Sequence, residues 1–324
     1  MNEISWGIIG CGDVTEVKSG PAFSKVPGSR LQAVMRRDGA KAADYAARHG
    51  VPRWYANAAD LLADPAVTAV YIATPPAAHE AYTLQALAAG KPVYVEKPMA
   101  TSAAAARRMA DAAQAAGIPL VVAHYRRAQP LFRKVKELLE GGAIGTPLSA
   151  ELVLHEPHDA GLVARGDSPW RLDPAVSGGG LFWDLAPHAL DLLLHWFGTP
   201  EMSSGASWNA YGTYEVPDTT AGIARLPGGV LATGRWCFGW PRKEDRCTLT
   251  GTEGTLRFSI FAPAPLLLER DGTETRFDFP PLPHVQEPMI AAVTAHFLGQ
   301  GPNPAPAREG VAVMEWMEAY GKGS

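Results

Sequence analysis

The sequence contains few cysteines and no long apolar run. The three cysteines among 324 residues are Cys11, Cys237 and Cys247, and they form no Cys-x-x-Cys pair. An odd number without that spacing argues against a disulfide framework or a zinc site and is typical of a reducing compartment. No apolar stretch is long enough to cross a bilayer, and no basic segment precedes an apolar run at the start. We therefore expect a cytoplasmic protein.

The chain also lacks a strong excess of charge of either sign. Lys and Arg number 29 against 33 Asp and Glu, which gives a net charge of -4, and no long basic run occurs. This balance argues against a nucleic-acid or anionic-membrane partner and favours a small molecule. The length exceeds that of a usual single core, and 47% hydrophobic residues are ordinary for a globular protein. Two domains are therefore expected.

The segment Pro92 to Pro98 (PVYVEKP) predicts a buried strand that stops where Glu96 and Lys97 leave the sheet. Ligands of open parallel sheets bind beyond the carboxyl ends of the strands, where loops and helix starts converge. Lys97 is therefore a candidate catalytic residue. The alternative is a lysine that merely extends into water from a strand end.

A glycine turn follows the first predicted strand, Ile4 to Ile9. Gly10 suits a tight turn, and Gly12 lets the backbone approach a pyrophosphate. A predicted helix start at Asp13, Val14 and Thr15 would offer backbone N–H groups to that phosphate. Strand, glycine turn and helix start together indicate a dinucleotide site.

Two arginines follow the second predicted strand, residues 30 to 35. A carboxylate at this position binds the ribose hydroxyls of NAD, whereas the guanidinium groups of Arg36 and Arg37 can hold a 2'-phosphate. The pattern predicts a preference for NADP(H), with use of NAD(H) still possible. The alternative is a solvated strand end.

Strands and helices alternate from residue 4 to 123. The apolar strand at residues 67 to 73 ends at Thr74 and Pro75, which we expect over the cofactor, with His79 within reach in the next helix. A helix that runs to Ala89 follows this strand. After the strand that ends before Lys97, a helix at 101 to 116 leads to a further strand at 118 to 123. This order predicts a doubly wound parallel sheet in a domain of residues 1–123.

These motifs together resemble the glucose-fructose oxidoreductase, inositol dehydrogenase and MocA (Gfo/Idh/MocA) family. The resemblance rests on Gly10-Cys11-Gly12, Thr74-Pro75-Pro76, His79 and Glu96-Lys97-Pro98, and it extends over nearly the whole chain. It implies a Rossmann domain that binds a nicotinamide cofactor, joined to a substrate domain with an open sheet. Thr15 replaces the last glycine of the motif, and Arg36 replaces an acid.

The second half, residues 124–324, predicts an α+β domain. After a helix at 131 to 140, short alternating strands are separated by Pro-Gly-Gly, Thr-Glu-Gly and Asp-Gly turns, and two helices follow near the end. The fold class is therefore α/β, with an N-terminal doubly wound sheet and a C-terminal, mostly antiparallel open sheet. An open sheet has to cover its apolar side, so we expect a homodimer or homotetramer through this sheet.

The stretch SGGGLFWDLAPHALDLLLHWFG predicts a helix with Asp184 and His188 one turn apart on one face. An aspartate that bonds one imidazole nitrogen leaves the other free to move a proton. The residues alone also allow a simple surface pair. The family resemblance implies that Lys97, Asp184 and His188 form one catalytic set, which requires residues from both halves of the chain to meet at the substrate.

Further ligand contacts are predicted near these motifs. Trp170 and Arg171 precede the glycines, where similar enzymes have a loop that reaches toward cofactor or substrate, although the tryptophan also suits a core. Tyr125, His155 and His158 are expected to contact substrate. Because a proline interrupts the segment His155 to Asp159, a polar pocket rim is favoured over a metal site.

The predicted reaction is a hydride transfer between nicotinamide C4 and a carbinol or carbonyl carbon of a sugar, sugar derivative or polyol. His188 moves the hydroxyl proton, Lys97 bonds the same oxygen, and Asp184 holds one of them in place. Two alternatives stay open. One is a glycosidase that retains its cofactor and acts by transient oxidation and elimination; the other is a dinucleotide-sensing protein without turnover.

Overall fold

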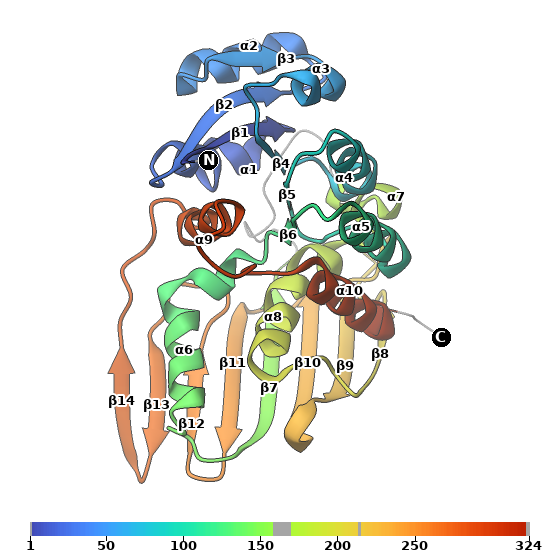
Figure 1. The fold of residues 1–324 in the computed structure, drawn as a ribbon. Coiled ribbons are helices and arrows are strands. Elements are labelled where there is room, and N and C mark those ends of the chain that lie inside the picture. The colour runs from blue at the N-terminus through green and yellow to red at the C-terminus, as the bar shows by residue number, and fades with distance from the viewer. Residues whose placement is uncertain (1, 158–169, 213–214, 322–324) are drawn as a thin grey trace. The chain divides into compact units, whose positions relative to one another are not determined.

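The computed structural model describes residues 2–157, 170–212 and 215–321, and the chain divides into two compact units. The first unit comprises residues 1–129 and 282–311, and the second comprises residues 130–281 and 312–324. Each unit contains one β-sheet, here called sheet A and sheet B (Figure 1). The division into domains at residue 123 stays a prediction.

Sheet A is a six-stranded parallel sheet in the order β3-β2-β1-β4-β5-β6. Strand numbers rise outward from β1 on one side and from β4 on the other, so the topological switch point lies between these two strands. The strands are β1 (Ile4–Ile9), β2 (Ser29–Met35), β3 (Arg53–Tyr55), β4 (Ala69–Ile72), β5 (Val93–Val95) and β6 (Leu120–Val122).

The helices of the first unit begin and end at residues suited to these positions. Asp38, Asn57 and Ser102 each accept a backbone N–H bond at a helix start, and Gly50 and Gly117 end helices in the left-handed conformation. The elements are α1 (Asp13–Val17), η1 (Gly20–Ser24), α2 (Gly39–His49), α3 (Ala58–Ala63), η2 (Pro76–Ala78), α4 (His79–Ala88), α5 (Ala103–Ala116), η3 (Tyr125–Ala128), α9 (Glu287–Phe297) and the start of α10 (Ala307–Gly321).

The core of the first unit is aromatic. Trp6 and Phe23 have ring centroids 4.9 Å apart, and Tyr71 stacks on Tyr94 at 5.1 Å. All four side chains are fully buried. Strands β1, β4, β5 and β6 are buried along their whole length, as expected for parallel strands covered on both faces. The ends of these strands are therefore where charged side chains of this sheet can reach a ligand.

Sheet B has eight strands in the order β14-β13-β12-β11-β7-β10-β9-β8. All neighbouring strands are antiparallel except β7 and β10, which run parallel. The strands are β7 (Pro147–Glu156), β8 (Met202–Trp208), β9 (Thr219–Arg225), β10 (Leu231–Phe238), β11 (Glu244–Gly251), β12 (Gly254–Phe258), β13 (Leu266–Arg270) and β14 (Thr273–Phe277).

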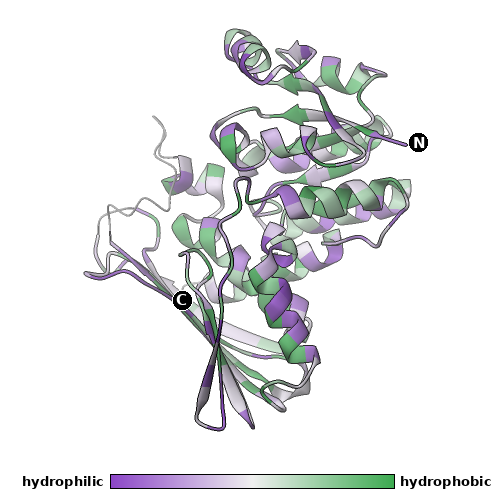
Figure 2. Ribbon diagram, turned by 90° about the vertical axis from the view of Figure 1, so that its left-hand side faces the viewer, coloured by the Kyte–Doolittle hydropathy of each residue, from purple (hydrophilic) through white to green (hydrophobic). Residues whose placement is uncertain are grey.

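Helices of the second unit cover one face of sheet B (Figures 1 and 2). Trp236 of β10 packs edge-on against Phe182 at 5.1 Å and lies 6.1 Å from Tyr320. Successive side chains of a strand point to opposite faces, so Arg235 and Cys237 lie on the other face, here called the open face. The helical elements are α6 (Pro130–Glu140), η4 (Trp170–Leu172), α7 (Pro174–Ser177), α8 (Leu181–Phe197), η5 (Pro227–Gly229) and the end of α10.

The predicted fold class is confirmed, since sheet A is parallel and sheet B is mostly antiparallel. Two strands were not predicted. β3 contains only three residues, largely exposed, and β8 is rich in serine, glycine and alanine, so neither has the apolar pattern of a strand. Among the described residues, no helix is both long and apolar enough to cross a membrane.

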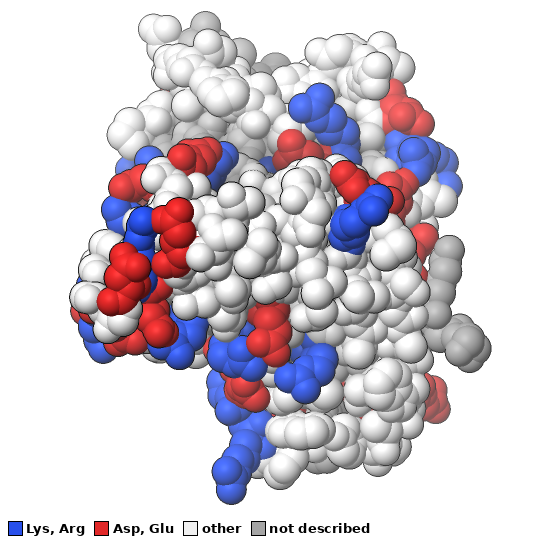
Figure 3. Space-filling model, turned by 90° about the horizontal axis from the view of Figure 1, so that it is seen from below, with Lys and Arg blue, Asp and Glu red and all other residues white. Residues whose placement is uncertain are grey.

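Charged side chains are mixed on the surface. On the face drawn in Figure 3, basic and acidic groups lie next to one another. Ion pairs of strands β12 to β14 give the same pattern, with Arg257 beside both Glu269 and Glu274. This surface shows no broad basic area of the kind that binds nucleic acid.

Candidate functional site at the strand ends of sheet A and on helix α8

The candidate residues of the first half follow the carboxyl ends of parallel strands. Gly10 follows β1, Arg36 follows β2, Thr74 lies just beyond β4, Lys97 just beyond β5, and Tyr125 just beyond β6. In a parallel sheet these ends share one edge, where backbone groups and loops are available to a ligand. The fold therefore brings residues that are up to 115 positions apart to one edge of sheet A.

The glycine turn packs closely against Thr74 at Gly10 and faces open space at Gly12. Gly10 has a φ of +96°, and a Cβ built there would lie 2.7 Å from Thr74 Cγ2. A Cβ at Gly12 would meet nothing within 4 Å, so the backbone there faces free space. Asp13 and Val14 then begin α1, while the Thr15 hydroxyl donates to the Gly12 carbonyl oxygen at 2.7 Å. The turn fits the pyrophosphate of a dinucleotide.

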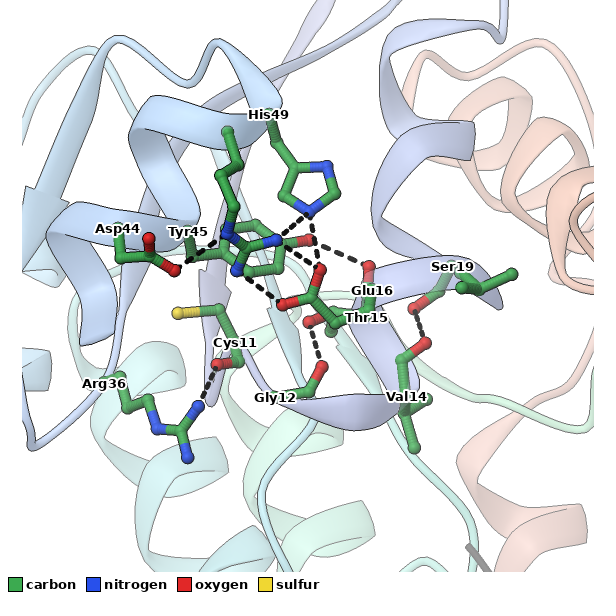
Figure 4. Close-up of polar contacts among 12 residues, drawn as sticks. Cys11, Gly12, Val14, Thr15, Glu16, Ser19, Arg36, Asp44, Tyr45 and His49 are labelled. Carbon is green, nitrogen blue, oxygen red and sulfur yellow. Dashed lines mark hydrogen bonds and ion pairs between the residues drawn. The ribbon is translucent and has the colours of Figure 1, made fainter.

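A charged cluster not predicted from the sequence joins α1 to α2 (Figure 4). Arg48 donates to both carboxylate oxygens of Glu16, at 2.8 and 2.9 Å, and to Asp44 at 2.8 Å. His49 Nε2 lies 2.8 Å from Glu16. Hydrogen bonding from Arg48, helped by His49, lowers the pKa of Glu16 to about 2. The cluster fixes α1, and thus the glycine turn, against the next helix.

Arg36 lies against the glycine turn. Its Nη1 donates to the Cys11 carbonyl oxygen at 3.3 Å, as Figure 4 shows. Arg37 is exposed, and Asp38 accepts the Lys41 backbone N–H as the cap of α2. A guanidinium group between the turn and the start of α2 is well placed for an anionic group of a ligand. Cys11 itself is buried, which raises the pKa of its thiol to about 11.

The loop after β4 offers an unsatisfied polar atom. Thr74 Oγ1 is buried and has no hydrogen-bond partner among the described residues, whereas Pro75 beside it is exposed. A buried hydroxyl without a partner is costly unless a ligand or water bonds it. Together with the free space at Gly12, this atom fits a bound nicotinamide dinucleotide, for which the sequence predicted Thr74 and Pro75.

His79 is fully buried at the start of α4. One ring nitrogen lies 2.8 Å from the Thr74 carbonyl oxygen and the other 3.0 Å from that of Pro98. Burial lowers the pKa of His79, and a neutral ring has one N–H to donate. His79 therefore links the loop after β4 to the loop after β5. Its predicted contact with cofactor stays a prediction.

Lys97 stands between a buried carboxyl group and a proline. The Lys97–Pro98 peptide bond is cis, and the Lys97 backbone N–H donates to Glu96 Oε2 at 3.1 Å. Glu96 is only 6% exposed. Its other oxygen accepts bonds from Tyr71 and Gln286. The sequence predicted Glu96 and Lys97 but not Gln286, which lies 190 positions away and has no motif of its own.

Helix α8 of the second unit carries Asp184 and His188. Asp184 Oδ2 accepts from Arg171 Nε at 3.0 Å, and both side chains are largely buried. The Arg171 guanidinium also lies over the Trp170 ring, 4.4 Å from its centroid. A cation held on a ring and on a carboxylate has a fixed position. The structure thus groups three predicted residues, Trp170, Arg171 and Asp184.

His188 is 4% exposed and packs edge-on against Phe261, with ring centroids 5.5 Å apart. The loop of Phe261 is held by Asp245, whose carboxylate accepts three successive backbone N–H bonds from residues 260, 261 and 262. A carboxylate bonded in this way fixes a loop firmly. Asp245 and Phe261 were not predicted, because their loop reaches His188 only in the folded unit.

His155 and Glu156 end β7 on opposite faces. His155 lies on the open face, where its ring contacts the tilted ring of Trp240, with centroids 4.6 Å apart. Glu156 points to the face that α8 covers, is 3.0 Å from Lys243 Nζ, and has a pKa raised by burial. The role of His155 in substrate binding stays a prediction, and His158 lies outside the described residues.

A parallel sheet with a switch point between β1 and β4, and a glycine turn directly after β1, define a Rossmann fold. Residues 4–124 match the family described as "Oxidoreductase family, NAD-binding Rossmann fold", and residues 132–257 match "GFO/IDH/MocA C-terminal domain". The chain belongs to the Gfo/Idh/MocA family, and the predicted enzyme class is confirmed.

Several relatives match over most of their length. Oxidoreductase P35 of Formosa agariphila is 39% identical over 98% of both chains, and a 1,5-anhydro-D-fructose reductase of Ensifer adhaerens is 31% identical over 78% of this chain and 74% of its own. A crystal structure of an Agrobacterium radiobacter oxidoreductase with NAD+, L-tartaric acid and magnesium superposes with a TM-score of 0.82. It is 23% identical over 98% of this chain and 95% of its own. At this identity the likeness shows a shared fold alone.

Proposed function

We propose that this oxidoreductase uses NADP(H) to interconvert a carbinol and a carbonyl group in a sugar, sugar derivative or polyol. The observation that carries the proposal is the gathering of the glycine turn, Arg36, Thr74 and Lys97 at one edge of sheet A. That edge combines a fit for a dinucleotide with an amine suited to a reacting oxygen.

The proposed roles follow from ordinary proton chemistry. A bound nicotinamide cofactor supplies or accepts the hydride. During oxidation, His188 takes the proton of the substrate hydroxyl, and in the reverse direction it returns that proton. Lys97 donates a hydrogen bond to the same oxygen and stabilises the negative charge that develops there. Asp184 lies on the same helix as His188 and holds Arg171 in position through their ion pair.

Replacing Lys97 tests the proposal most directly. Lys97→Met keeps an unbranched side chain that is one atom shorter but removes the charge and the donor. We expect kcat to fall by at least about 100-fold, because loss of one preorganised donor costs that much in comparable sites. The dissociation constant of the cofactor, measured by nicotinamide fluorescence, should change little.

Lys134→Met is the matched control, since Lys134 pairs with Glu137 on the surface of α6. It should keep wild-type turnover. The double variant Lys97→Met/His188→Asn should be hardly slower than the worse single variant, because residues that act as one unit show non-additive losses. Unchanged turnover in Lys97→Met would refute the proposed role.

Arg36 supports the proposed preference for NADP(H). Its guanidinium group lies against the glycine turn, at the position that normally selects between the two cofactors. Arg36→Asp should weaken NADP(H) binding by about 100-fold while leaving NAD(H) binding nearly unchanged, since only the former loses charge-assisted bonds and gains repulsion. Titration with both cofactors measures the ratio, and an equal loss for both would contradict the preference.

The substrate class is proposed from polar side chains near α8 and from the named activity of one relative. The 1,5-anhydro-D-fructose reductase acts on a sugar derivative by its name. A panel of sugars, polyols and deoxysugar ketones, followed at the nicotinamide absorbance with both cofactors, identifies the substrate. A chromogenic glycoside cleaved without added cofactor would instead favour the elimination mechanism.

We further propose that the open face of sheet B pairs with a second copy of the chain. Met202, Trp208, Ile223 and Leu231 of β8 to β10 are 44% to 55% exposed. By the register of these strands, all four point to the open face. Exposed apolar side chains gathered on one face are typical of an oligomer interface. Light scattering measures whether the chain is a dimer or a tetramer.

A further inference from the structure

The Glu96 carboxyl group connects Lys97 to distant parts of the first unit. Oε1 accepts a bond from the Tyr71 hydroxyl at 2.5 Å and one from Gln286 Nε2 at 2.6 Å. Oε2 accepts the backbone N–H of Lys97 at 3.1 Å. The orientation of this carboxyl group therefore depends on Gln286 as well as on the strand that carries it.

Gln286 is itself held on both sides. It is 1% exposed, directly precedes α9, and donates its backbone N–H to the Lys18 carbonyl oxygen at 3.2 Å. A carboxylate only accepts hydrogen bonds, so the amide nitrogen of Gln286 has to face Glu96. Its amide oxygen then accepts from the Tyr94 hydroxyl at 3.1 Å. This arrangement allows one orientation of the amide.

The bonds to this carboxyl described above come from donors without charge, namely the Tyr71 hydroxyl, the Gln286 amide and a backbone N–H. Burial raises the pKa of Tyr71 and of Tyr94 well above the usual value of 10, so both hydroxyls keep their protons. Other titratable or charged groups near the network are His79 beside Glu96, Tyr125 beside Tyr94, and Lys18, His284 and Glu287 around Gln286. Neutral donors can hold a buried carboxylate only if each of them is correctly placed.

We propose that Gln286 is a positioning residue for the reaction. It keeps the Glu96 carboxyl in the orientation that accepts the Lys97 backbone N–H, and thereby fixes the starting point of the Lys97 side chain. The proposal rests on the proposed function, in which Lys97 bonds the reacting oxygen. A misplacement of about 1 Å at such a group can cost about 100-fold in rate.

Gln286→Glu tests this proposal because it changes the donor into an acid of the same shape. In this variant two carboxyl groups occupy positions that lie 2.6 Å apart in the native pair, so they share one proton until a higher pH removes it, and then repel each other. We expect kcat to fall by about 100-fold as the pH rises, with an alkaline limb absent from the wild-type profile, while cofactor binding changes far less.

A second measurement needs no substrate. Hydrogen exchange of the Lys97 backbone N–H, followed by mass spectrometry of the peptide that contains it, should become faster in Gln286→Glu as the pH rises beyond the intrinsic pH effect. The bond to Glu96 Oε2 protects this N–H in the wild type. Faster exchange would show that the change at residue 286 reaches the backbone of Lys97.

Gln129→Glu is the matched control. Gln129 is also a largely buried glutamine of the first unit, but its Nε2 donates to the Val285 carbonyl oxygen at 3.0 Å instead of to Glu96. It should show neither the alkaline limb nor faster exchange at Lys97. The exchanged pair Glu96→Gln/Gln286→Glu contains one carboxyl and one amide again, so it should lose the alkaline limb of the single variant.

The outcomes separate this proposal from the proposed function. If Lys97→Met is inactive but Gln286→Glu has the wild-type pH profile and unchanged exchange, only the positioning role is wrong. The same limb in Gln129→Glu would also overturn the role, because it would reflect any buried acid in this region. If Lys97→Met keeps its turnover, the proposed function fails regardless of Gln286.

Discussion

Sheet A and sheet B differ in how their strands are buried. The central strands of sheet A are buried on both faces, whereas strand β8 of sheet B alternates between exposed and half-buried residues along its whole length. In sheet A the candidate polar side chains follow the strand ends, where Lys97 and Thr74 lie. In sheet B the face decides, so neighbours such as His155 and Glu156 have unrelated surroundings.

The difference teaches where each half of the chain can carry chemistry. A strand end of sheet A exposes backbone and side chains together, so it offers both to a ligand. Sheet B instead has helices packed on one face. Helix α8 packs on that face through Phe182 and carries Asp184 and His188. Substitutions at buried positions and at exposed positions of the two sheets test this comparison.

The largest effect is expected for a charge inside sheet A. Val70 of β4 is completely buried, and Val70→Asp would place a carboxylate among apolar side chains without a partner. Such a change costs more than about 4 kcal/mol, which approaches the total stability of many proteins. Urea denaturation followed by circular dichroism should show a protein that is largely unfolded.

Ile223→Asp is the counterpart in sheet B, since Ile223 lies on the open face and is 44% exposed. The fold should remain intact, with helix and strand signals as in the wild type, while light scattering should show smaller particles. An unfolded Ile223→Asp would contradict the description of this face as open within one chain.

An intermediate effect is expected when the two faces of sheet B are compared. Trp236 is 1% exposed on the helix side of β10, and Leu231 is 45% exposed on the open face. Trp236→Ala should lower the free energy of unfolding by about 3–5 kcal/mol because it leaves a cavity. Leu231→Ala should lower it by less than about 0.5 kcal/mol at concentrations where the chain is monomeric. Equal losses would mean that both faces are covered.

The smallest effect concerns the charged cluster at the glycine turn. Hydrogen bonding from Arg48 lowers the folded-state pKa of Glu16 from 4.5 to about 2. The stability from this carboxylate is therefore present above pH 4.5 and is lost as the pH falls toward 2. Because 34% of the side chain is exposed, the contribution is at most about 1 kcal/mol.

Glu16→Gln should thus be less stable than the wild type at pH 7, and the difference should shrink between pH 4.5 and pH 2. Urea denaturation at both ends of this range measures it. Glu269→Gln in sheet B is the comparison, since its pair with Arg257 is about half exposed and should contribute almost nothing. A difference that stays constant down to pH 2 would contradict the role of Arg48.

Much of the fold follows from local patterns. The apolar run at Ile4 to Ile9 and the residues of β5 predicted strands correctly, because a buried parallel strand needs an unbroken apolar segment. The end of the helix predicted at 101 to 116 was equally readable, since Gly117 follows it and adopts the left-handed conformation. β3 and β8 were not, because their strand conformation is supported by neighbouring strands and not by their own residues.

The candidate site was predicted unevenly for a related reason. The Gly10 turn, Arg36 and Lys97 were found because each follows directly on a recognisable strand. Glu16 with Arg48, and Asp245 with the loop of Phe261, were missed, because each pair is 16 or more positions apart and is brought together only by packing.

The order of the residues alone determined the buried apolar strands of sheet A, which strand ends carry an amine or a guanidinium group, and the family to which the chain belongs. Those properties depend on side chains within a few positions of one another. Tertiary structure alone decided that an amide near the C-terminus would lie 2.6 Å from the carboxyl group of Glu96. Such a contact depends on how whole elements pack, and no short stretch of sequence contains that information.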